Sequence, residues 1–101
     1  MLIVKIHEAQ GKRVAAVCDS ELIGKRFTQN KLQLDLSSKF YAGEEMKEES
    51  FESMVESFDV INMVGERVIA IAIKQGLIKE KDIIRISGIP HAQVLNLDPI
   101  R

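Results

Sequence analysis

The sequence predicts a small α+β domain: a mostly antiparallel sheet with a central pair of helices packed on one face. The chain has 101 residues, 46% of them hydrophobic, which suits one compact core and leaves no room for a second. Residues 2–36 and 83–97 contain strand-like alternation, whereas residues 50–75 have helical spacing. Because the helices follow one another instead of alternating with strands, α+β is favoured over a doubly wound parallel sheet.

The chain is predicted to begin with a β-hairpin. Residues 2–7 alternate as a strand does, residues 13–18 are apolar and strand-like, and Gln10-Gly11 between them is a turn signal. Asp19 and the polar residues after it can cap a helix of about one turn, which Gly24 would end.

The next elements are a strand and an irregular loop. Leu32, Leu34 and Leu36 alternate with polar residues and predict a strand over 32–36, with a less marked strand before it at 25–29. Residues 37–47 are irregular, and we expect a surface loop held by burial of its aromatic residues.

The spacing predicts helix over residues 50–75, divided near residues 58–60. Asp59 can cap the second helix, and Gly76 supplies its end. A short strand over 83–86 and a last strand over 92–97 flank a turn at residues 88–91. The side chains expected to cover the sheet are Met54, Val55, Phe58, Ile61, Val68, Ile69 and Ala72.

Charge is distributed unevenly along the chain. The formal net charge is −1, so no whole-molecule field would attract nucleic acid or an anionic membrane. Residues 42–59 carry −6, whereas residues 1–41 carry +3 and residues 60–101 carry +2. We interpret the acidic block as a solvated helix face near a helix amino terminus, with metal binding or phosphate mimicry as alternatives. Its members are Glu44, Glu45, Glu48, Glu49, Glu52, Glu56 and Asp59.

The cysteine count and the short apolar runs indicate a cytoplasmic protein without a membrane partner. The single cysteine excludes an internal disulfide and any cysteine-pair zinc motif. The apolar runs at 1–4 and 68–73 are far shorter than a signal-peptide core or the ~20 residues of a membrane span. We expect no metal and no cofactor.

Three residues could form a catalytic corner: Cys18, Glu66 and His91. Cys18 precedes a predicted helix amino terminus, which would lower its pKa, but strand alternation with Val14 and Ala16 favours an inert core thiol. His91 follows Pro90 in a restricted segment that would hold an imidazole in place. A histidine in such a place is also a common structural group.

Asn62 and Glu66 are predicted to share one face of the second helix, at i and i+4. Gly65 between them would allow close approach of another segment. The pair either joins the helix to the Pro90 loop as a polar network, the favoured interpretation, or forms the floor of a pocket. We expect Glu66 and His91 to lie close together. His7 is too isolated to complete a metal site, because zinc needs three or four ligands.

Basic side chains interleaved with aromatic ones in the first 41 residues suggest nucleic-acid binding. Aromatic rings among cations can stack on bases while the charges follow the phosphates. No established RNA-binding motif accompanies them, and scattered bases also serve solubility. The candidate binding residues are Lys12, Arg13, Lys25, Arg26, Lys31, Lys39 and Tyr41, with Asn62, Glu66 and His91 as a second group.

Four short blocks, taken in order, resemble a family of small archaeal proteins known as domain of unknown function 424. They are residues 18–25 (CDSELIGK), 40–44 (FYAGE), 62–67 (NMVGER) and 88–93 (GIPHAQ). The resemblance spans nearly the whole chain. It implies an archaeal, cytosolic, single-domain α+β protein, brings no activity or catalytic residue, and suggests that the four blocks form one site or one folding unit.

The combined expectation is one domain over residues 1–101 that acts as a non-catalytic binding module. We expect RNA or a translation-linked protein complex as the partner. The alternative from another class is a small enzyme, for example a hydrolase, that uses the Cys18, Glu66 and His91 corner. The sequence leaves open the strand order, the oligomeric state and the convergence of these three residues.

Overall fold

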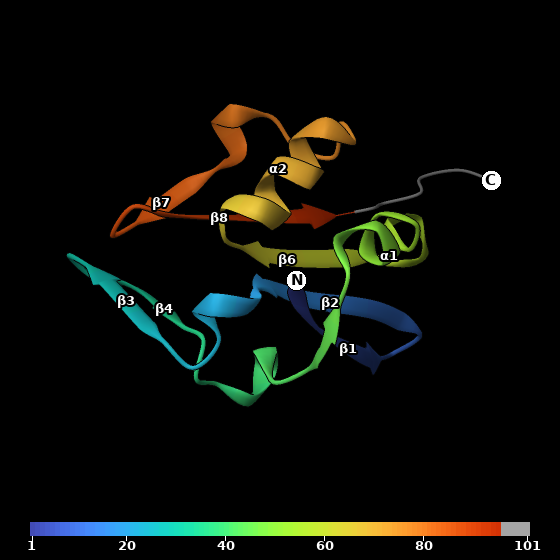
Figure 1. Cartoon of the computed structure of the whole chain (residues 1–101), viewed down its shortest axis with the longest axis horizontal. Helices are drawn as coiled ribbons and strands as arrows, with labels where there is room; N and C mark the ends of the chain where they lie inside the picture. Colours follow the sequence, from blue (N-terminus) through green and yellow to red (C-terminus); the bar gives the residue numbers. More distant parts are fainter. Residues whose placement is uncertain (96–101) are drawn as a thin grey trace.

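The structure, a computed structural model, describes residues 1–95 and contains a six-stranded sheet in the order β5-β1-β2-β6-β8-β7 (Figure 1). Four strand pairings are antiparallel and one, between β2 and β6, is parallel. The strands of this sheet are β1 (Leu2–Ala9), β2 (Lys12–Asp19), β5 (Glu44–Met46), β6 (Val60–Val64), β7 (Ile84–Ile86) and β8 (Ile89–Leu95).

The remaining elements lie on the two faces of the sheet. Two α-helices are present, α1 (Glu48–Glu52) and α2 (Glu66–Lys74). A separate hairpin, here called the arm, consists of β3 (Arg26–Gln29) and β4 (Leu32–Asp35). The single-turn 3₁₀ helices are η1 (Ser20–Leu22), η2 (Lys39–Tyr41), η3 (Val55–Ser57) and η4 (Glu80–Asp82).

The first hairpin forms as predicted. β1 and β2 pair antiparallel from Leu2 opposite Asp19 to Ala9 opposite Lys12. Gln10 and Gly11 connect them with φ values of 53° and 74°, so both central residues of this two-residue turn are left-handed. Such a turn matches the twist of the flanking strands.

The predicted central helical pair is wrong at residues 60–64, which form strand β6. Val60 pairs with Val14 and with Leu95, so β6 lies between β2 and β8. An apolar run bounded by polar residues fits a fully buried strand as well as a helix. Gly65, at φ 121°, separates β6 from α2. The helices are therefore short, and Asp59 caps neither of them: its carboxylate accepts a hydrogen bond from Arg13 N at 2.8 Å.

One face of the sheet carries the two α-helices found within residues 1–95. Phe51 of α1 and Val68 of α2 are fully buried against Leu2 and Val17 of the sheet. Six of the seven side chains expected to cover the sheet are in this core or beside it. Four are on helical turns, namely Val55 of η3 and Val68, Ile69 and Ala72 of α2, and Met54 and Phe58 directly flank η3. The seventh, Ile61, is also buried there but belongs to the sheet itself.

The opposite face is covered at one end by the arm and by η2. Leu34 and Leu36 from the arm side and Tyr41 from η2 bury Cys18 and Val64. The arm reaches the β7–β8 turn, where Ser87 N donates to Gln29 Oε1 at 2.7 Å and Ser87 Oγ donates to Thr28 O. Both hairpin tips therefore lie at the same end of the molecule (Figure 1).

Several predicted boundaries also change. The predicted short helix after β2 is the 3₁₀ turn η1, and the predicted loop over 37–47 contains η2 and the edge strand β5. Residues 89–91, predicted as a turn, begin strand β8; the last two residues of the predicted strand 92–97 lie outside the described residues. No helix within residues 1–95 is long and apolar enough to cross a membrane.

Candidate functional site

The predicted catalytic corner does not form around Cys18. The thiol has no exposed surface and lies in the apolar cluster between the sheet and the arm. Burial, with the neighbouring Asp19 and Glu21 carboxylates, raises the pKa of Cys18 to about 11. A thiol with this pKa carries almost no thiolate at neutral pH, and thiolate is the nucleophilic form. Cys18 is therefore a core residue.

Glu66 and His91 lie on opposite faces of the sheet. His91 pairs with Val64, which pairs with Cys18, so their side chains share the face away from α2. Glu66 begins α2, its side chain is 68% exposed, and it pairs with Arg85 at 3.1 Å. The predicted contact between Glu66 and His91 is thus wrong; Arg85 of β7 joins this hairpin to the helix instead. Burial lowers the pKa of His91, so its ring stays neutral at neutral pH.

The start of α2 is instead organised by Asp19, which no sequence pattern assigned to it. The Asp19 carboxylate is 3% exposed and accepts hydrogen bonds from Arg67 N at 2.9 Å and Val68 N at 3.0 Å. These are backbone donors that a helix amino terminus otherwise leaves unpaired. A Cβ on Gly65 would lie 2.3 Å from Asp19 Cγ, so the glycine makes room for the carboxylate.

The four sequence blocks meet around this junction. Arg67 pairs with Glu21 of the first block and donates to the Met1 carbonyl at 3.2 Å. Gly65 N donates to the Pro90 carbonyl of the fourth block at 2.9 Å. The second block contributes Tyr41, which packs in the cluster that contains Cys18 and Val64. These contacts hold distant segments of the fold together.

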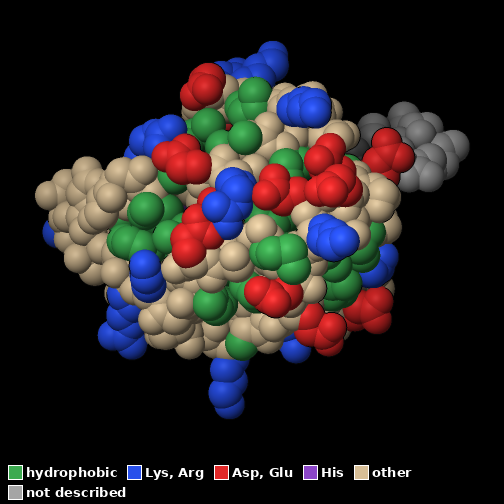
Figure 2. Space-filling model, in the orientation of Figure 1, with side chains coloured by type: hydrophobic (Ala, Val, Ile, Leu, Met, Phe, Trp, Pro, Cys, Tyr) green, Lys and Arg blue, Asp and Glu red, His purple; other side chains and the backbone are tan. Residues whose placement is uncertain are grey.

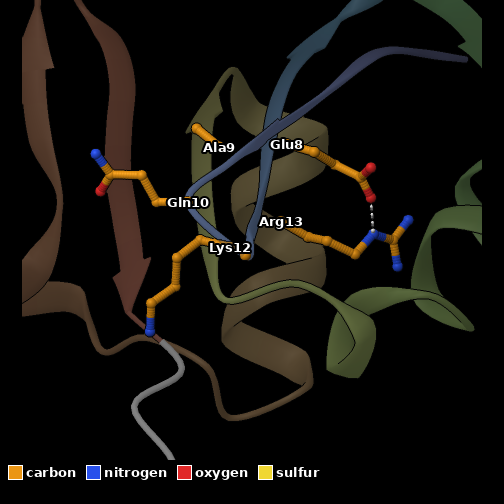
Figure 3. A pocket seen from close by; sticks show the side chains of 6 residues that line it. Glu8, Ala9, Gln10, Lys12 and Arg13 are labelled. Carbon is orange, nitrogen blue, oxygen red and sulfur yellow. Dashed lines mark ion pairs between the residues drawn. The ribbon is translucent and has the colours of Figure 1, made fainter.

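The predicted basic set is divided between the faces of the sheet. Arg13 points to the helical side, where it pairs with Glu8 at 3.6 Å and lies 5.0 Å over the Phe58 ring. Lys12 is the next residue along the strand and therefore points to the opposite face. Figure 3 shows the two side chains diverging from the open depression at this hairpin tip, which Gln10 also lines.

The arm carries three members of the basic set at the opposite end of the molecule from Lys12 (Figure 1). Arg26 pairs with Asp35 at 3.3 Å, whereas Lys25 and Lys31 make no ion pair within the described part of the chain. Tyr41 is buried, and burial raises its pKa to about 12. Its ring therefore supports the fold and is not free to stack on a base.

Away from the arm, the same face of the sheet is only partly covered: Gln93 and Leu95 are exposed, most of the other side chains are half-buried, and Ala16 is buried. The registers place Lys5, Ala16, Asn62 and Gln93 in one row across four strands, and His7, Val14, Val60 and Leu95 in the next. Gln93 Nε2 donates to Asn62 Oδ1 at 3.1 Å. Gln93 Oε1 and Asn62 Nδ2 have no partner among residues 1–95 and can bind a ligand. We call these two rows, together with Phe40 of η2, the open face.

Asn62 is therefore on strand β6, and the prediction that it shares a helix face with Glu66 is wrong. The open face was not predicted as a unit, because its residues come from β1, β2, β6, β8 and η2. Strand alternation in 2–7 would have placed Lys5 and His7 on one face, but their neighbours are set by the sheet order.

A stacked aromatic pair stands at the edge of the open face. His7 and Phe40 have ring centroids 4.7 Å apart and an interplanar angle of 12°. His7 Nε2 donates to the Phe40 carbonyl at 2.9 Å, which fixes the orientation of the imidazole. Sequence analysis counted Phe40 among the aromatic residues interleaved with the basic ones but did not pair it with His7, because the two are 33 positions apart and no pattern joins them.

The open face is positively charged relative to the helical side. Lys5 and Lys12 project from it and Lys39 precedes Phe40, whereas the register places only Glu45 among the described carboxylates of β1, β2, β5, β6 and β8 on this face. On the helical side, α1 carries Glu48, Glu49 and Glu52, and Figure 2 shows carboxylates around this part of the surface. No group of three metal-ligating side chains occurs within residues 1–95.

Comparisons with known proteins give the same family as the four blocks. The family described as "Protein of unknown function (DUF424)" matches residues 7–97. The chain belongs to this family. A similar solved structure is that of an uncharacterized conserved protein from Methanopyrus kandleri, with 26% identity, a TM-score of 0.76, and coverage of 99% of this chain and 96% of that one. Among curated proteins, none matches.

Membership of the DUF424 family brings no activity to this chain. Its mixed α/β architecture, with most strands in one six-stranded sheet, is shared over nearly the full length with the archaeal protein. The fold alone therefore does not identify a function, which depends on the chemistry of this chain's own surface.

Proposed function

We propose that this DUF424 protein is a non-catalytic module that binds RNA through the open face. The observation that carries the proposal is the stack of half-buried His7 on exposed Phe40, on the sheet face that also presents Lys5 and Lys12. Proteins that bind single strands combine aromatic rings with cations that follow the backbone. The positions of Lys5, Lys12 and Lys39 support such a path, and Lys25 and Lys31 on the arm can extend it.

The arrangement supports binding rather than catalysis. The thiol of Cys18 is buried, the Glu66 carboxylate pairs with Arg85, and His91 lies across the sheet from Glu66. General acid-base catalysis requires such groups within hydrogen-bond reach or one water apart. The proposed RNA partner belongs to a translation-linked complex. The test below also shows whether the chain binds a protein instead of RNA.

The proposal is tested by charge reversal on the open face. A fluorescein-labelled single-stranded RNA of mixed sequence is titrated with the parent and with the K5E/K12E/K39E variant, and binding is followed by fluorescence anisotropy. The titrations are repeated at salt concentrations between about 50 and 200 mM, over which counterion release changes the affinity. Three lost phosphate contacts should reduce the slope of log K against log salt by about 2. Thermal melting checks that the variant is folded.

A matched control carries the same change of net charge on the helical side. K74E/K79E/K81E alters one residue of α2 and two of the segment around η4. It should retain most of the affinity and the salt slope of the parent. The proposal is rejected if the parent binds no RNA at low salt, or if both triple variants weaken binding equally. Binding to a ribosomal protein fraction but not to RNA would also reject it.

A further inference from the structure

Phe40 is held in one orientation by contacts on several sides. Its ring stacks on His7 and meets the Tyr41 ring edge-on, with centroids 5.1 Å apart and an interplanar angle of 85°. Phe40 N donates to Ser38 Oγ at 3.0 Å, and Tyr41 N donates to Ser38 O at 3.2 Å. The turn that carries the ring is therefore ordered before any ligand arrives.

Despite these contacts Phe40 remains 37% exposed. His7 stacks on one face of the ring and Tyr41 meets the ring at 85°, so the exposed area belongs to the part of Phe40 that these two rings do not cover. Of the large hydrophobic side chains that are exposed within residues 1–95, Phe40 alone is aromatic. A fixed and partly exposed aromatic ring suits a flat, polarisable ligand, because packing against it costs little conformational entropy.

The surroundings of this ring fit a nucleotide. Lys39 immediately precedes Phe40, and Lys5 lies two residues before His7 on the same face of β1. A base stacked on Phe40 would thus have two cations in the vicinity of its phosphates. Bases inside a duplex are already stacked on both sides and cannot reach the ring without leaving the helix.

We infer that Phe40 is a stacking platform for one nucleobase, so that the RNA bound at the open face is single-stranded at this position. The inference rests on the proposed function and adds its ligand class. His7 is the positioning residue, because it supports the back of the Phe40 ring and bonds its carbonyl. Stacking on a phenyl ring tolerates any base, so we expect little sequence preference at this platform.

The test compares three RNA probes against variants at Phe40. The probes are a single strand of mixed sequence, the same strand with abasic sugars throughout, and a perfect hairpin duplex of equal phosphate number. For F40L, affinity for the single strand should fall by about 5- to 150-fold, the range measured for losing one base-aromatic stack. Affinity for the abasic strand should not change. F40W keeps an aromatic face and should bind the single strand at least as well as the parent.

Two controls separate stacking from general adhesion and from misfolding. L32A removes another exposed apolar side chain, 50% exposed on the arm, and should leave affinity for the single strand unchanged. Thermal melting of F40L identifies a folding defect, and F40W then still reports the role of the ring. If the parent binds single and abasic strands equally, the platform is refuted while RNA binding stands; if it binds no probe, the proposed function fails as well.

Discussion

Removing the Asp19 carboxylate should destabilise the fold more than any surface substitution. In D19A, the amides of Arg67 and Val68 lose a charged acceptor in a place that water reaches poorly. Each hydrogen bond to a charged group contributes about 1.5–3 kcal/mol. Part of this loss is offset in D19A, because the variant no longer has to bury a carboxylate. The expected net loss is about 2–4 kcal/mol, or about 8–30 °C in Tm for a domain of this size.

The close approach of Gly65 to Asp19 predicts coupling between the two positions. G65A should be destabilising in the parent, because its Cβ would meet the carboxylate at 2.3 Å and because φ is 121°. In the D19A background the first cause is absent and the second remains. The cost of G65A should therefore be smaller there, with an interaction energy of about 1–3 kcal/mol in a double-mutant cycle.

Urea unfolding monitored by circular dichroism measures these free energies, with E66A as the control. Glu66 is also at the start of α2, but its side chain is 68% exposed and its ion pair with Arg85 is solvated. We expect a cost below about 1 kcal/mol for E66A, since exposed pairs contribute little. A D19A variant that melts within about 3 °C of the parent, or a strictly additive cycle, would refute the capping argument.

The same residue predicts a pH dependence. Burial raises the pKa of Asp19 above its ordinary value of 3.8 by more than its hydrogen bonds and Arg67 lower it. The folded chain therefore binds this proton more tightly than the unfolded chain does. The stability of the parent relative to D19N should fall as pH rises from 3.8 through the raised pKa of Asp19, and be flat above it. A relative stability that rises over this window would contradict the assignment.

The remaining predictions concern a thiol and a glycine. Cys18 should not react with a thiol reagent at pH 8 in the native protein and should react fully in denaturant, because the thiol is buried and its pKa is about 11; rapid labelling of the native chain would contradict this. G43A should destabilise the fold by about 1–3 kcal/mol, because its Cβ would lie 2.0 Å from the Val4 carbonyl oxygen of β1 and neither backbone can yield freely. A G43A variant that melts like the parent would show that the contact between Gly43 and β1 is adjustable.

Local patterns determined the elements whose signals lie within a few residues. The Gln10-Gly11 turn and the alternation on either side specify the first hairpin, because turn geometry fixes its register. The same alternation placed Val14, Ala16 and Cys18 on one face, and this is confirmed by the shared cluster of Ala16 and Cys18. The family was also accessible from the four blocks alone.

The period of an apolar run was not sufficient where the run is short and lies at the centre of the sheet. Residues 60–64 fit helical spacing together with their neighbours, but their backbone pairs with strand β2 on one side and strand β8 on the other. Tertiary hydrogen bonding decided this segment, because a five-residue helix is weak alone and a central strand is paired on both sides. Because of this error, Asn62 was predicted on a helix, whereas the structure places it on strand β6 and the open face.

The tertiary structure alone decided which functional groups meet. Cys18 and His91 share a face and Glu66 lies on the other, so the expected corner is divided by the sheet. His7 meets Phe40 because η2 crosses back over β1, a contact between distant segments that carries no local signal. Sequence periodicity determines the face on which a side chain stands, but the neighbours on that face follow from strand order, which depends on the free energy of the whole fold.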